Sequence, residues 1–406
     1  MKTETFESYK QFYHDQLIND CIPFWMNSDL IDKENGGYIT SVDRTGKSYN
    51  NDKSVWFQGR CLWTFSALCN RYGEKKEWMD GAKAGVDFLD TKCTDSDGRM
   101  FFQVTRDGRP LRKRRYMYSE SFYVISMAEY ALASGNRKYL KKAEDCFELM
   151  LKLYRTPEAD PFKITPKSYA STRNERASAV PMVLVSCAQL LRRCDLQKAE
   201  YYNSVAKEMA DIIIKYHYKP ELKCVLETVD EDGSRIDIPA GRTVNPGHSM
   251  ENSWFIMNQA IYNKDNTLLK QALNILDWSL ELGWDKQYGG FIYFTDIDGR
   301  PCEQLEHDMK LWWVHNEALI ATLMAYGLTG NKKYWDWFEK VHLYSFGHFA
   351  DKENGEWYGY LHNDGTVSHT QKGSMWKGPF HYPRCLMNCE ALLDMLVKEK
   401  PIEGIL

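Results

Sequence analysis

The sequence lacks an excess of charge of either sign. Its 406 residues include 52 lysines and arginines against 56 aspartates and glutamates, which gives a net charge of -4. Proteins that bind nucleic acid through their surface carry a basic patch, and this chain has one short basic run, Arg112–Arg115. We interpret that run as a solvated hairpin end, with a phosphate or partner site as the alternative. Nucleic-acid binding is therefore not expected.

A long apolar segment is missing from the N-terminus. Residues Met1–Asn19 carry charges throughout, so they match neither a signal peptide nor a membrane span. The eleven cysteines are scattered and include no Cys-x-x-Cys pair, as is typical of reduced thiols. Cys385 and Cys389 lie one helical turn apart near His381 and are candidate metal ligands, although buried free cysteines are common in cores. We expect a cytoplasmic protein without a membrane segment or a metal.

Several catalytic motifs are absent as well. The chain has no Gly-x-Gly-x-x-Gly that opens a helix after a strand, no Walker loop, no Gly-x-Ser-x-Gly elbow and no His-Glu-x-x-His. The segment Gln371–Gly378 contains glycine and lysine that could cradle phosphate, but it lacks P-loop spacing and is weak support for a nucleotide site. No required cofactor is expected.

The strongest positive signal is an internal repeat. Four of five similar turns contain Asp-Gly, which predicts β-hairpins with type I′ turns. The turn glycines are separated by 62, 125, 66 and 66 residues, and the gap of 125 spans two periods. A sixth unit is expected near residue 170, where the polar stretch Pro157–Arg176 replaces the turn. The five segments, which place aromatic or β-branched residues before a turn glycine, are Gly37–Gly46, Phe101–Gly108, Val225–Gly233, Phe291–Gly299 and Trp357–Gly365.

Between the hairpins the apolar spacing becomes helical, with two helices in each unit. The helices after the hairpins are predicted at Lys53–Arg71, Ser119–Leu132, Ala177–Arg193, His248–Tyr262, Leu311–Gly327 and His381–Lys398. Their partners are predicted at Glu7–Trp25, Glu77–Lys92, Lys138–Leu153, Ala199–Tyr216, Thr267–Leu282 and Lys333–Phe349. The first set suits burial on most sides, whereas the partners alternate apolar pairs with lysine and glutamate, which is typical of an outer layer.

These twelve helices predict an all-α fold, an (α/α)6 barrel or toroid of six helix-hairpin repeats, with short β-hairpins at one end. We expect residues 1–406 to form a single domain of this kind. A linear helical solenoid is the alternative, but neither end of the chain has an obvious polar capping repeat.

Such a toroid would gather the starts of its inner helices around one axial cleft. His248 and Glu251 share a helix face at a spacing of three, so the carboxylate can hold or charge the imidazole. His381 and Arg384 repeat that spacing. Histidines and tryptophans are often structural, but histidines at corresponding points of two repeats favour a function, and tryptophans can stack on a sugar ring. The candidates are Trp56, Arg60, Tyr118, Glu120, Tyr123, Arg173, Arg176, Asn245, His248, Glu251, Trp312, Trp313, His315, Glu317, Trp376, Lys377, His381 and Arg384.

At these residues the sequence resembles the N-acylglucosamine 2-epimerase family. The resemblance implies the (α/α)6 barrel and metal-free proton transfer, often in a homodimer, with ATP as an activator in some members. It implies roles for Arg60, His248, Glu251, Glu317, His381 and Arg384. Cellobiose and mannobiose 2-epimerases and aldose-ketose isomerases usually place a histidine where this chain reads Ala179–Met182, a pattern that resembles the N-acylglucosamine branch. Pro379 departs from the expected small or thiol residue. The matching segments are Val55–Arg60, Thr105–Pro110, Ser119–Tyr123, Asn245–His248 with Glu251 and Trp254, Lys310–Glu317, Gly355–Tyr360 and His381–Arg384.

The expected activity is interconversion of N-acetylglucosamine and N-acetylmannosamine. Epimerisation at C2 requires ring opening, removal of the proton next to the C1 carbonyl and return of a proton to the opposite face, which two imidazoles can perform near neutral pH. We predict catalytic roles for His248, His381, Arg60, Glu251 and Glu317, and substrate binding by Trp56, Tyr118, Glu120, Arg176, Trp313, Trp376, Lys377 and Arg384.

Three alternatives remain open at this stage. A related enzyme of the same superfamily would act on mannose, cellobiose or mannobiose, or would be an aldose-ketose isomerase. A glycoside hydrolase on the same toroid would use Glu251 and Glu317 as paired carboxylates. A non-catalytic binding protein is the third alternative.

Overall fold

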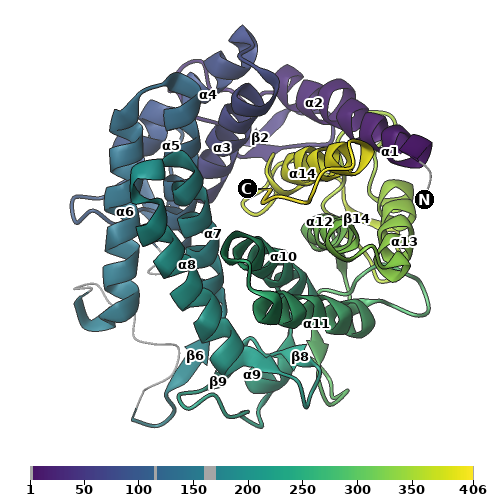
Figure 1. The fold of residues 1–406 in the computed structure, drawn as a ribbon. Coiled ribbons are helices and arrows are strands. Elements are labelled where there is room, and N and C mark those ends of the chain that lie inside the picture. Colours follow the sequence, from purple (N-terminus) through teal and green to yellow (C-terminus); the bar gives the residue numbers. More distant parts are fainter. Residues whose placement is uncertain (1–2, 114–116, 160–170, 406) are drawn as a thin grey trace.

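The structure, a computed structural model, describes residues 3–113, 117–159 and 171–405. In these ranges the helices form two concentric rings (Figure 1), so the expected (α/α)6 toroid is confirmed. The inner ring consists of α3 (Val55–Tyr72), α5 (Tyr118–Ser134), α7 (Ala179–Cys194), α10 (Pro246–Asn263), α12 (Trp312–Thr329) and α14 (His381–Val397). The outer ring consists of α1 (Thr3–Asp15), α2 (Ile22–Asn27), α4 (Lys76–Lys92), α6 (Arg137–Arg155), α8 (Ala199–Ile212), α11 (Asn266–Gly283) and α13 (Lys332–His348).

The predicted helices agree with these elements to within a few residues at most ends. Burial separates the rings as expected, because α12 is buried without interruption from Trp312 to Ala325. The first outer helix differs from its prediction, since a π-helical segment, Gln16–Cys21, joins α1 to α2. Pro23, which lacks an N–H, lies just after this segment, where Ile22 N–H still donates to Leu17 O with π-helical spacing.

The first and last units of the chain are in contact, which excludes a linear solenoid. Helix α1 packs against α14, and Lys10 Nζ lies 2.7 Å from Asp394 Oδ1 across that contact. In the inner ring, Thr64 Oγ1 of α3 donates a hydrogen bond of 2.5 Å to the carbonyl of Pro379, just before α14. The ring therefore closes on itself.

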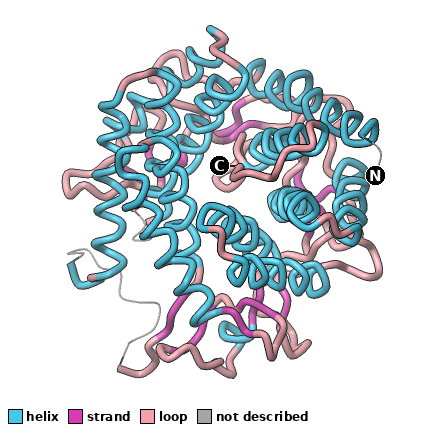
Figure 2. Tube along the Cα trace, in the orientation of Figure 1, coloured by secondary structure: helices cyan, strands magenta, loops and turns pink. Residues whose placement is uncertain are grey.

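Short strands precede the inner helices and tie neighbouring units together (Figure 2). Strand β3 pairs with β4, β6 with β9, β10 with β11 and β12 with β13, so a strand that enters an inner helix joins a hairpin further along the chain. The strands are β1 (Ser41–Val42), β2 (Ser48–Asn50), β3 (Lys53–Ser54), β4 (Gln103–Val104), β5 (Pro110–Arg112), β6 (Glu175–Ala177), β7 (Tyr218–Lys219), β8 (Cys224–Val225), β9 (Thr228–Asp230), β10 (Thr243–Val244), β11 (Thr295–Asp296), β12 (Lys310–Leu311), β13 (Tyr360–Leu361) and β14 (Val367–His369), with the short helix α9 (Pro239–Arg242) before β10.

The tight turns form where predicted, but the prediction of type I′ turns is wrong. Gly108 has a φ of 92°, whereas Asp107 does not share the positive φ that a type I′ turn needs at both central residues. Gly108 N donates to Thr105 O at 2.9 Å, and Thr105 N donates to Arg109 O at 2.8 Å. This pattern is a type I turn followed by a left-handed glycine. The same turn bond occurs at Gly46, Gly233, Gly299 and Gly365.

Two expectations fall partly outside the described residues. Residues 114 and 115 of the basic run lie outside the described ranges. Within the described part of that run, Lys113 Nζ lies 2.6 Å from a carboxylate oxygen of Asp95 and of Asp97. The sixth unit expected near residue 170 falls on residues 160–170. Strand β6, which follows that stretch, pairs with β9.

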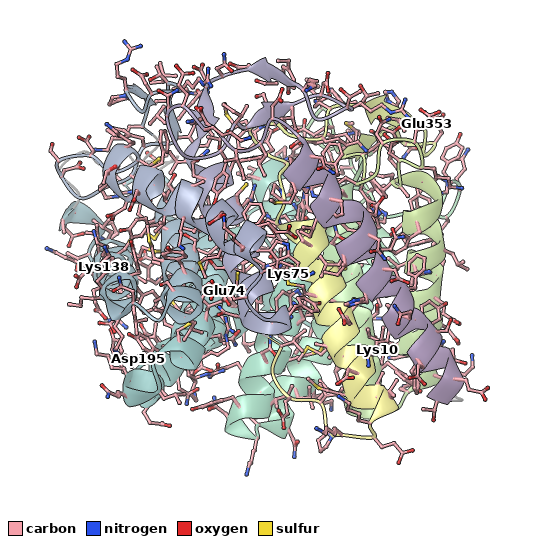
Figure 3. All side chains as sticks on the ribbon, turned by 90° about the horizontal axis from the view of Figure 1, so that it is seen from above. Lys10, Glu74, Lys75, Lys138, Asp195 and Glu353 are labelled. Carbon is pink, nitrogen blue, oxygen red and sulfur yellow. The ribbon has the colours of Figure 1, made fainter. Side chains whose placement is uncertain are left out.

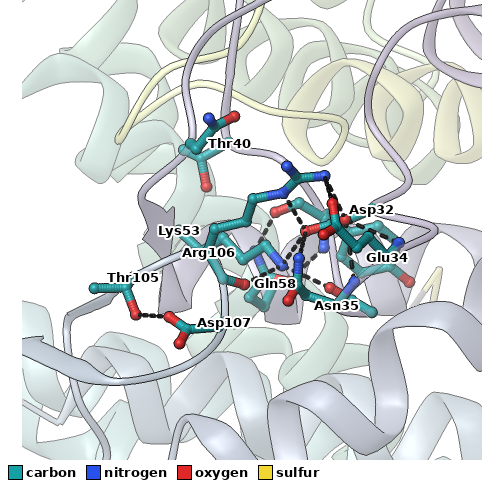
Figure 4. A network of polar contacts seen from close by, with 12 residues as sticks. Asp32, Glu34, Asn35, Thr40, Lys53, Gln58, Thr105, Arg106 and Asp107 are labelled. Atoms are coloured by element: carbon teal, nitrogen blue, oxygen red, sulfur yellow. Dashed lines mark hydrogen bonds and ion pairs between the residues drawn. The ribbon is translucent and has the colours of Figure 1, made fainter.

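A network of ion pairs joins the loop after α2 to the turn between β4 and β5 (Figure 4). Asp32 accepts hydrogen bonds of 2.9 Å from Lys53 Nζ and from Arg106 Nε and Nη2. Although burial opposes ionisation, these bonds hold the pKa of Asp32 well below its usual range. Lys53 also donates to the carbonyls of Gly36 and Arg106, so three oxygens surround its ammonium group, although burial still lowers its pKa.

The end of the ring opposite the hairpins is covered by the C-terminal segment, which lies over the centre in Figure 1. Ile402 and Ile405 are buried there, and Ile405 N donates to Asn258 Oδ1 of α10 at 3.1 Å. The labelled charged residues of Figure 3, such as Lys10 and Lys138, belong to outer helices or to connecting loops. Among the described helices, none has the length and apolar character needed to cross a membrane.

Candidate active site

A cavity of about 820 Å³ opens where the six inner helices begin. Each inner helix contributes side chains from its first turns, and the loops before α12 and α14 complete the wall. Among the predicted site residues, the wall contains Trp56, Arg60, Tyr118, His248, Glu251, Trp313, Trp376, His381 and Arg384. The structure therefore brings most of the candidates to one place.

His381 is the first residue of α14, and Glu317 of α12 lies directly behind it. Nδ1 of His381 is 2.8 Å from Glu317 Oε1. An ionised carboxylate can only accept, so we assign the imidazole proton to Nδ1, which leaves Nε2 as the basic atom. Burial, together with the positive charges of Arg384 and Arg60, holds the pKa of His381 well below its ordinary value. His381 is therefore neutral at pH 7.

His248 lies in the first turn of α10, which is held by a capping bond from its own N–H to Asn245 Oδ1 at 3.1 Å. Its Nδ1 is 3.2 Å from Glu227 Oε2, on the segment between β8 and β9. Burial opposes the charge on the imidazole, but the negative charge and hydrogen bond of Glu227 outweigh it and raise the pKa of His248. The pKa values of the two histidines thus shift in opposite directions, and His248 is the more readily protonated of the two.

Glu251 was predicted to hold or charge His248; it does not hydrogen-bond the imidazole, but its negative charge contributes to the raised pKa of His248. Glu251 Oε1 instead accepts a hydrogen bond of 2.8 Å from Arg384 Nη2, and the same nitrogen donates to Glu317 Oε1 at 2.5 Å. A shared helix face at a spacing of three brought the side chains near each other, but a guanidinium from α14 provides the stronger partner. Burial lowers the pKa of Arg384, and the two carboxylates more than offset it, so the net shift is upward.

The oxygen and nitrogen atoms of Glu251, Glu317 and His381 lie within 4.8 Å of one another, as in many metal sites. Arg384 already donates to both carboxylates, so a cation here would have to displace a buried guanidinium. This donor set fits an organic charge network better than a metal.

Arg60 of α3 is buried at the wall beside this network. Its Nη1 donates to the carbonyl of Trp376 at 2.7 Å, and its guanidinium lies 4.4 Å from the ring centre of Phe122. Nε of Arg60 has no protein partner among the described residues. Burial and the charge of Arg384, against the opposing effect of Glu251, lower the pKa of Arg60 to about 10, which still leaves it charged at neutral pH. Because Arg60 also lines the cavity, its guanidinium charge suits a negative oxygen of a bound ligand.

Aromatic rings form the remaining wall. The indole of Trp313 contacts both catalytic candidates, with ring centres 5.2 Å from His248 and 5.8 Å from His381. Trp56 packs against Tyr118 and Trp376, with centre distances of 5.5 Å in each pair. Trp376 is 43% exposed, so one side of this aromatic group is available at the mouth of the cavity.

Three residues predicted to bind substrate lie elsewhere. Glu120 is buried towards the preceding hairpin loop, where it accepts from Arg99 Nε at 2.7 Å. Arg176 lies on β6 and donates to the carbonyl of Glu231 at 2.5 Å. Neighbouring residues on a helix or strand point in different directions, so these two side chains point away from the cavity and bind protein partners instead.

The third is Lys377, which is 1% exposed and forms an ion pair with Glu356 behind the wall. Two other candidates are also structural. His315 lies between Leu311 O at 2.8 Å and Phe291 N at 3.0 Å, and burial lowers its pKa to about 3. Tyr123 donates to Asp90 of the outer ring at 2.7 Å.

Glu227 is the site residue that sequence reasoning missed. It lies within the predicted hairpin Val225–Gly233, but nothing in its spacing relates it to His248, 21 residues later. The one feature of the sequence that could have indicated Glu227 is that it is an acidic residue close to a predicted turn.

The family model for "N-acylglucosamine 2-epimerase (GlcNAc 2-epimerase)" matches residues 37–382. The N-acylglucosamine 2-epimerase of Mus musculus is 36% identical over 403 residues, which cover 97% of this chain and 94% of the mouse protein. The chain belongs to the N-acylglucosamine 2-epimerase family. The expected enzyme class, an isomerase that acts on carbohydrates, agrees with this membership.

Solved structures agree with the fold of this family member. The cellobiose 2-epimerase of Spirochaeta thermophila DSM 6192 superimposes with a TM-score of 0.83 at 21% identity, covering 97% of this chain and 98% of the other. A D-mannose isomerase gives a TM-score of 0.80 at 18% identity, with 95% and 98% covered. At these identities the likeness supports the toroid and not a substrate.

Proposed function

We propose that this epimerase interconverts N-acetylglucosamine and N-acetylmannosamine by proton transfer at C2 of the open-chain sugar. The observation that carries the proposal is a pair of imidazoles on one cavity wall, one with a lowered and one with a raised pKa. The mouse relative supports the N-acyl substrate, and the wall from α7, with Ala179, Met182 and Val183, offers an apolar surface for an acetyl methyl group.

The proposed reaction begins with neutral His381 as the base and charged His248 as the acid. Nε2 of His381 removes the proton from C2, and the electron pair moves through the C1–C2 bond to O1, which gives an enolate. Nε2 of His248 then returns a proton to C2 on the opposite face. The product leaves the enzyme with the two protonation states exchanged, and the reverse reaction starts from that form. Both directions therefore need one neutral and one charged imidazole.

Arg60 has the role of stabilising the enolate. Its guanidinium lines the cavity and stays charged, so it favours the negative O1 over the neutral carbonyl, and a positioned donor of this kind contributes about 10²- to 10³-fold in kcat. Glu317 fixes the tautomer of His381, and Glu227 keeps His248 charged. Glu251 and Glu317 together hold Arg384.

The test of the reaction is a proton NMR time course in D₂O with N-acetylmannosamine, mannose and cellobiose offered separately, with and without ATP. We expect N-acetylglucosamine that carries deuterium at C2, while the recovered N-acetylmannosamine stays largely protonated early in the reaction, because different bases serve the two faces. Turnover of mannose or cellobiose alone would replace the substrate. Product that retains the original C2 proton would contradict the two-base mechanism.

Replacing Glu227 by glutamine tests the charge assignment of His248. The profile of kcat/KM against pH should be bell-shaped, because activity requires His381 without its extra proton and His248 with it. The Glu227 carboxylate raises the pKa of His248, and its loss leaves burial, which lowers that pKa. The alkaline limb of the variant should therefore move to lower pH, while the acid limb stays in place.

The control for this experiment is Glu231→Gln, an exposed position on the same hairpin. It should leave both limbs unchanged. An unmoved alkaline limb in Glu227→Gln, or a shift of the acid limb instead, would contradict the assignment.

The hydrolase alternative receives little support from the carboxylates. Glu317 is fully buried and accepts from Trp254, His381 and Arg384, so neither of its oxygens is open to a substrate. A hydrolase would release two sugars from a glycoside, whereas an epimerase conserves the mass of a free reducing sugar. The NMR time course with cellobiose separates these outcomes.

We further propose that residues 1–406 act as one catalytic domain in a cytoplasmic homodimer whose activity responds to ATP. Eleven free thiols support a reducing compartment, and the family resemblance supports the dimer and the nucleotide response. Sedimentation with and without ATP, beside the NMR assay, tests the last two points.

A further inference from the structure

Three loops that precede hairpins share one design. In each, an aspartate N–H donates to the carbonyl of the residue five positions later, at 3.0 Å from Asp32 to Gly37, 2.8 Å from Asp285 to Gly290 and 3.1 Å from Asp351 to Glu356. Each aspartate also pairs with a buried lysine, namely Lys53, Lys310 and Lys372. Glu356 therefore stands where the other two loops carry glycine.

The backbone at this position favours glycine. φ is 71° at Gly37, 72° at Gly290 and 58° at Glu356, all in the left-handed region. A Cβ built on Gly37 would lie 2.7 Å from Gln58, and one on Gly290 would lie 2.4 Å from Tyr344. Glu356 is thus a bulky residue in a strained conformation, and such strain is concentrated at functional sites.

The side chain of Glu356 lies beneath the cavity wall. It is 1% exposed, and its carboxylate forms an ion pair with Lys377 Nζ, which is equally buried. Lys372 Nζ donates to the carbonyl of Glu356 at 3.1 Å, so a second positive charge holds the loop from the other side. The strain at Glu356 is maintained by this pair of lysines.

Lys377 in turn is adjacent to the residue that holds Arg60. The preceding residue, Trp376, offers its carbonyl to Arg60 Nη1 at 2.7 Å. The turn around both is tight, since Ser374 N donates to Lys377 O at 2.9 Å and Lys377 N donates to Ser374 Oγ at 3.1 Å. The place of the Trp376 carbonyl therefore depends on where Lys377 is anchored.

We infer that Glu356 is a positioning residue for the epimerase reaction, which acts through Lys377 and the Trp376 carbonyl to hold Arg60 towards the cavity. The inference rests on the proposed role of Arg60 at the enolate oxygen. It also explains why Lys377, which sequence reasoning connected with substrate, is buried away from the cavity. A misplaced guanidinium would weaken the transition state more than substrate binding.

The test is a double-mutant cycle of Glu356→Gln with Arg60→Lys, read as kcat and KM of folded protein. Glu356→Gln should lower kcat by about 10- to 100-fold with KM within about twofold of wild type, since small errors of placement have effects of that size. In the Glu356→Gln background, Arg60→Lys should add much less than it does alone, although Glu356 and Arg60 do not share a hydrogen bond in the described structure.

A second variant guards against loss of folding. Glu356→Gln with Lys377→Met removes both charges together, so no buried charge is left alone, and it should show the same fall in kcat. Glu353→Gln, on the exposed part of the same loop (Figure 3), is the matched control and should behave as wild type.

Wild-type turnover, measured first, tests the proposed function by itself. An active wild type together with unaltered kcat in both Glu356 variants, or effects of Glu356→Gln and Arg60→Lys that simply multiply, would overturn the positioning role alone. A change confined to the unfolding temperature would have the same meaning, because a purely structural pair would alter stability and leave turnover per folded molecule unchanged.

Discussion

Replacing His381 by asparagine is expected to lower kcat by about 10²- to 10⁴-fold, the contribution of a positioned general base. Asparagine keeps a donor towards Glu317 but cannot take up a proton, so the fold should persist while the base is lost. His248→Asn should cause a loss of similar size through the missing acid. The measurement is steady-state turnover of N-acetylmannosamine, with circular dichroism to verify folding.

The two histidine variants should differ in which proton they still exchange. Each retains one imidazole, on one face of C2, so each should exchange the C2 proton of a different epimer with D₂O. His14→Asn is the control, because His14 lies on α1 and contacts Glu390 at the outside of α14, away from the cavity. Near wild-type turnover in either site variant, or exchange of the same epimer by both, would refute the two-histidine scheme.

The fold was largely accessible from sequence because its signals are local and repeated. Apolar spacing located the helices of both rings, and the spacing of turn glycines indicated their arrangement in units. The turn type was misread because Asp-Gly fits both a two-residue type I′ loop and a three-residue loop whose glycine is left-handed. The choice between these loops depends on how the two strands are paired, and the dipeptide Asp107–Gly108 alone does not determine that pairing.

The active site could be predicted from the sequence only in part, because the sequence does not show in which direction each side chain points. That the inner helix starts meet follows from the toroid, so His248 and His381 could be grouped without coordinates. The partner of each histidine could not, since Glu227 and Glu317 come from other units of the ring. Lys377 was assigned to substrate because it lies close to the predicted start of the last inner helix, yet its charge faces the interior and pairs with Glu356.

Replacing Glu317 by glutamine is expected to lower kcat by an amount on the order of 10⁴-fold, the loss that follows when a catalytic histidine is held in the wrong tautomer. All three neighbours of Glu317 are donors: Trp254 Nε1 at 2.8 Å from Oε2, with His381 Nδ1 and Arg384 Nη2 on Oε1. An amide has one accepting end. If its NH₂ group faces His381, the imidazole must accept at Nδ1 and carry its proton on Nε2, where the base is needed.

The opposite orientation of the amide keeps the tautomer of His381 but lacks the negative charge that stabilises its protonated form, so kcat still falls. The NH₂ group would then face the Trp254 N–H and leave two buried donors opposed, and Arg384 would lose half of its negative surroundings in either case. Breaking a buried pair of this kind costs about 3–5 kcal/mol, so the unfolding temperature should fall along with kcat.

Glu390→Gln is the matched control for Glu317→Gln. Glu390 also holds a histidine Nδ1, that of His14 at 3.0 Å, and a tyrosine hydroxyl, that of Tyr72 at 2.5 Å, but it lies on the outer side of α14. It should alter stability modestly and leave kcat near the wild-type value. If Glu317→Gln kept kcat within tenfold of wild type, the carboxylate would not set the tautomer of His381, and the proton path through Nε2 would have to be assigned to another base.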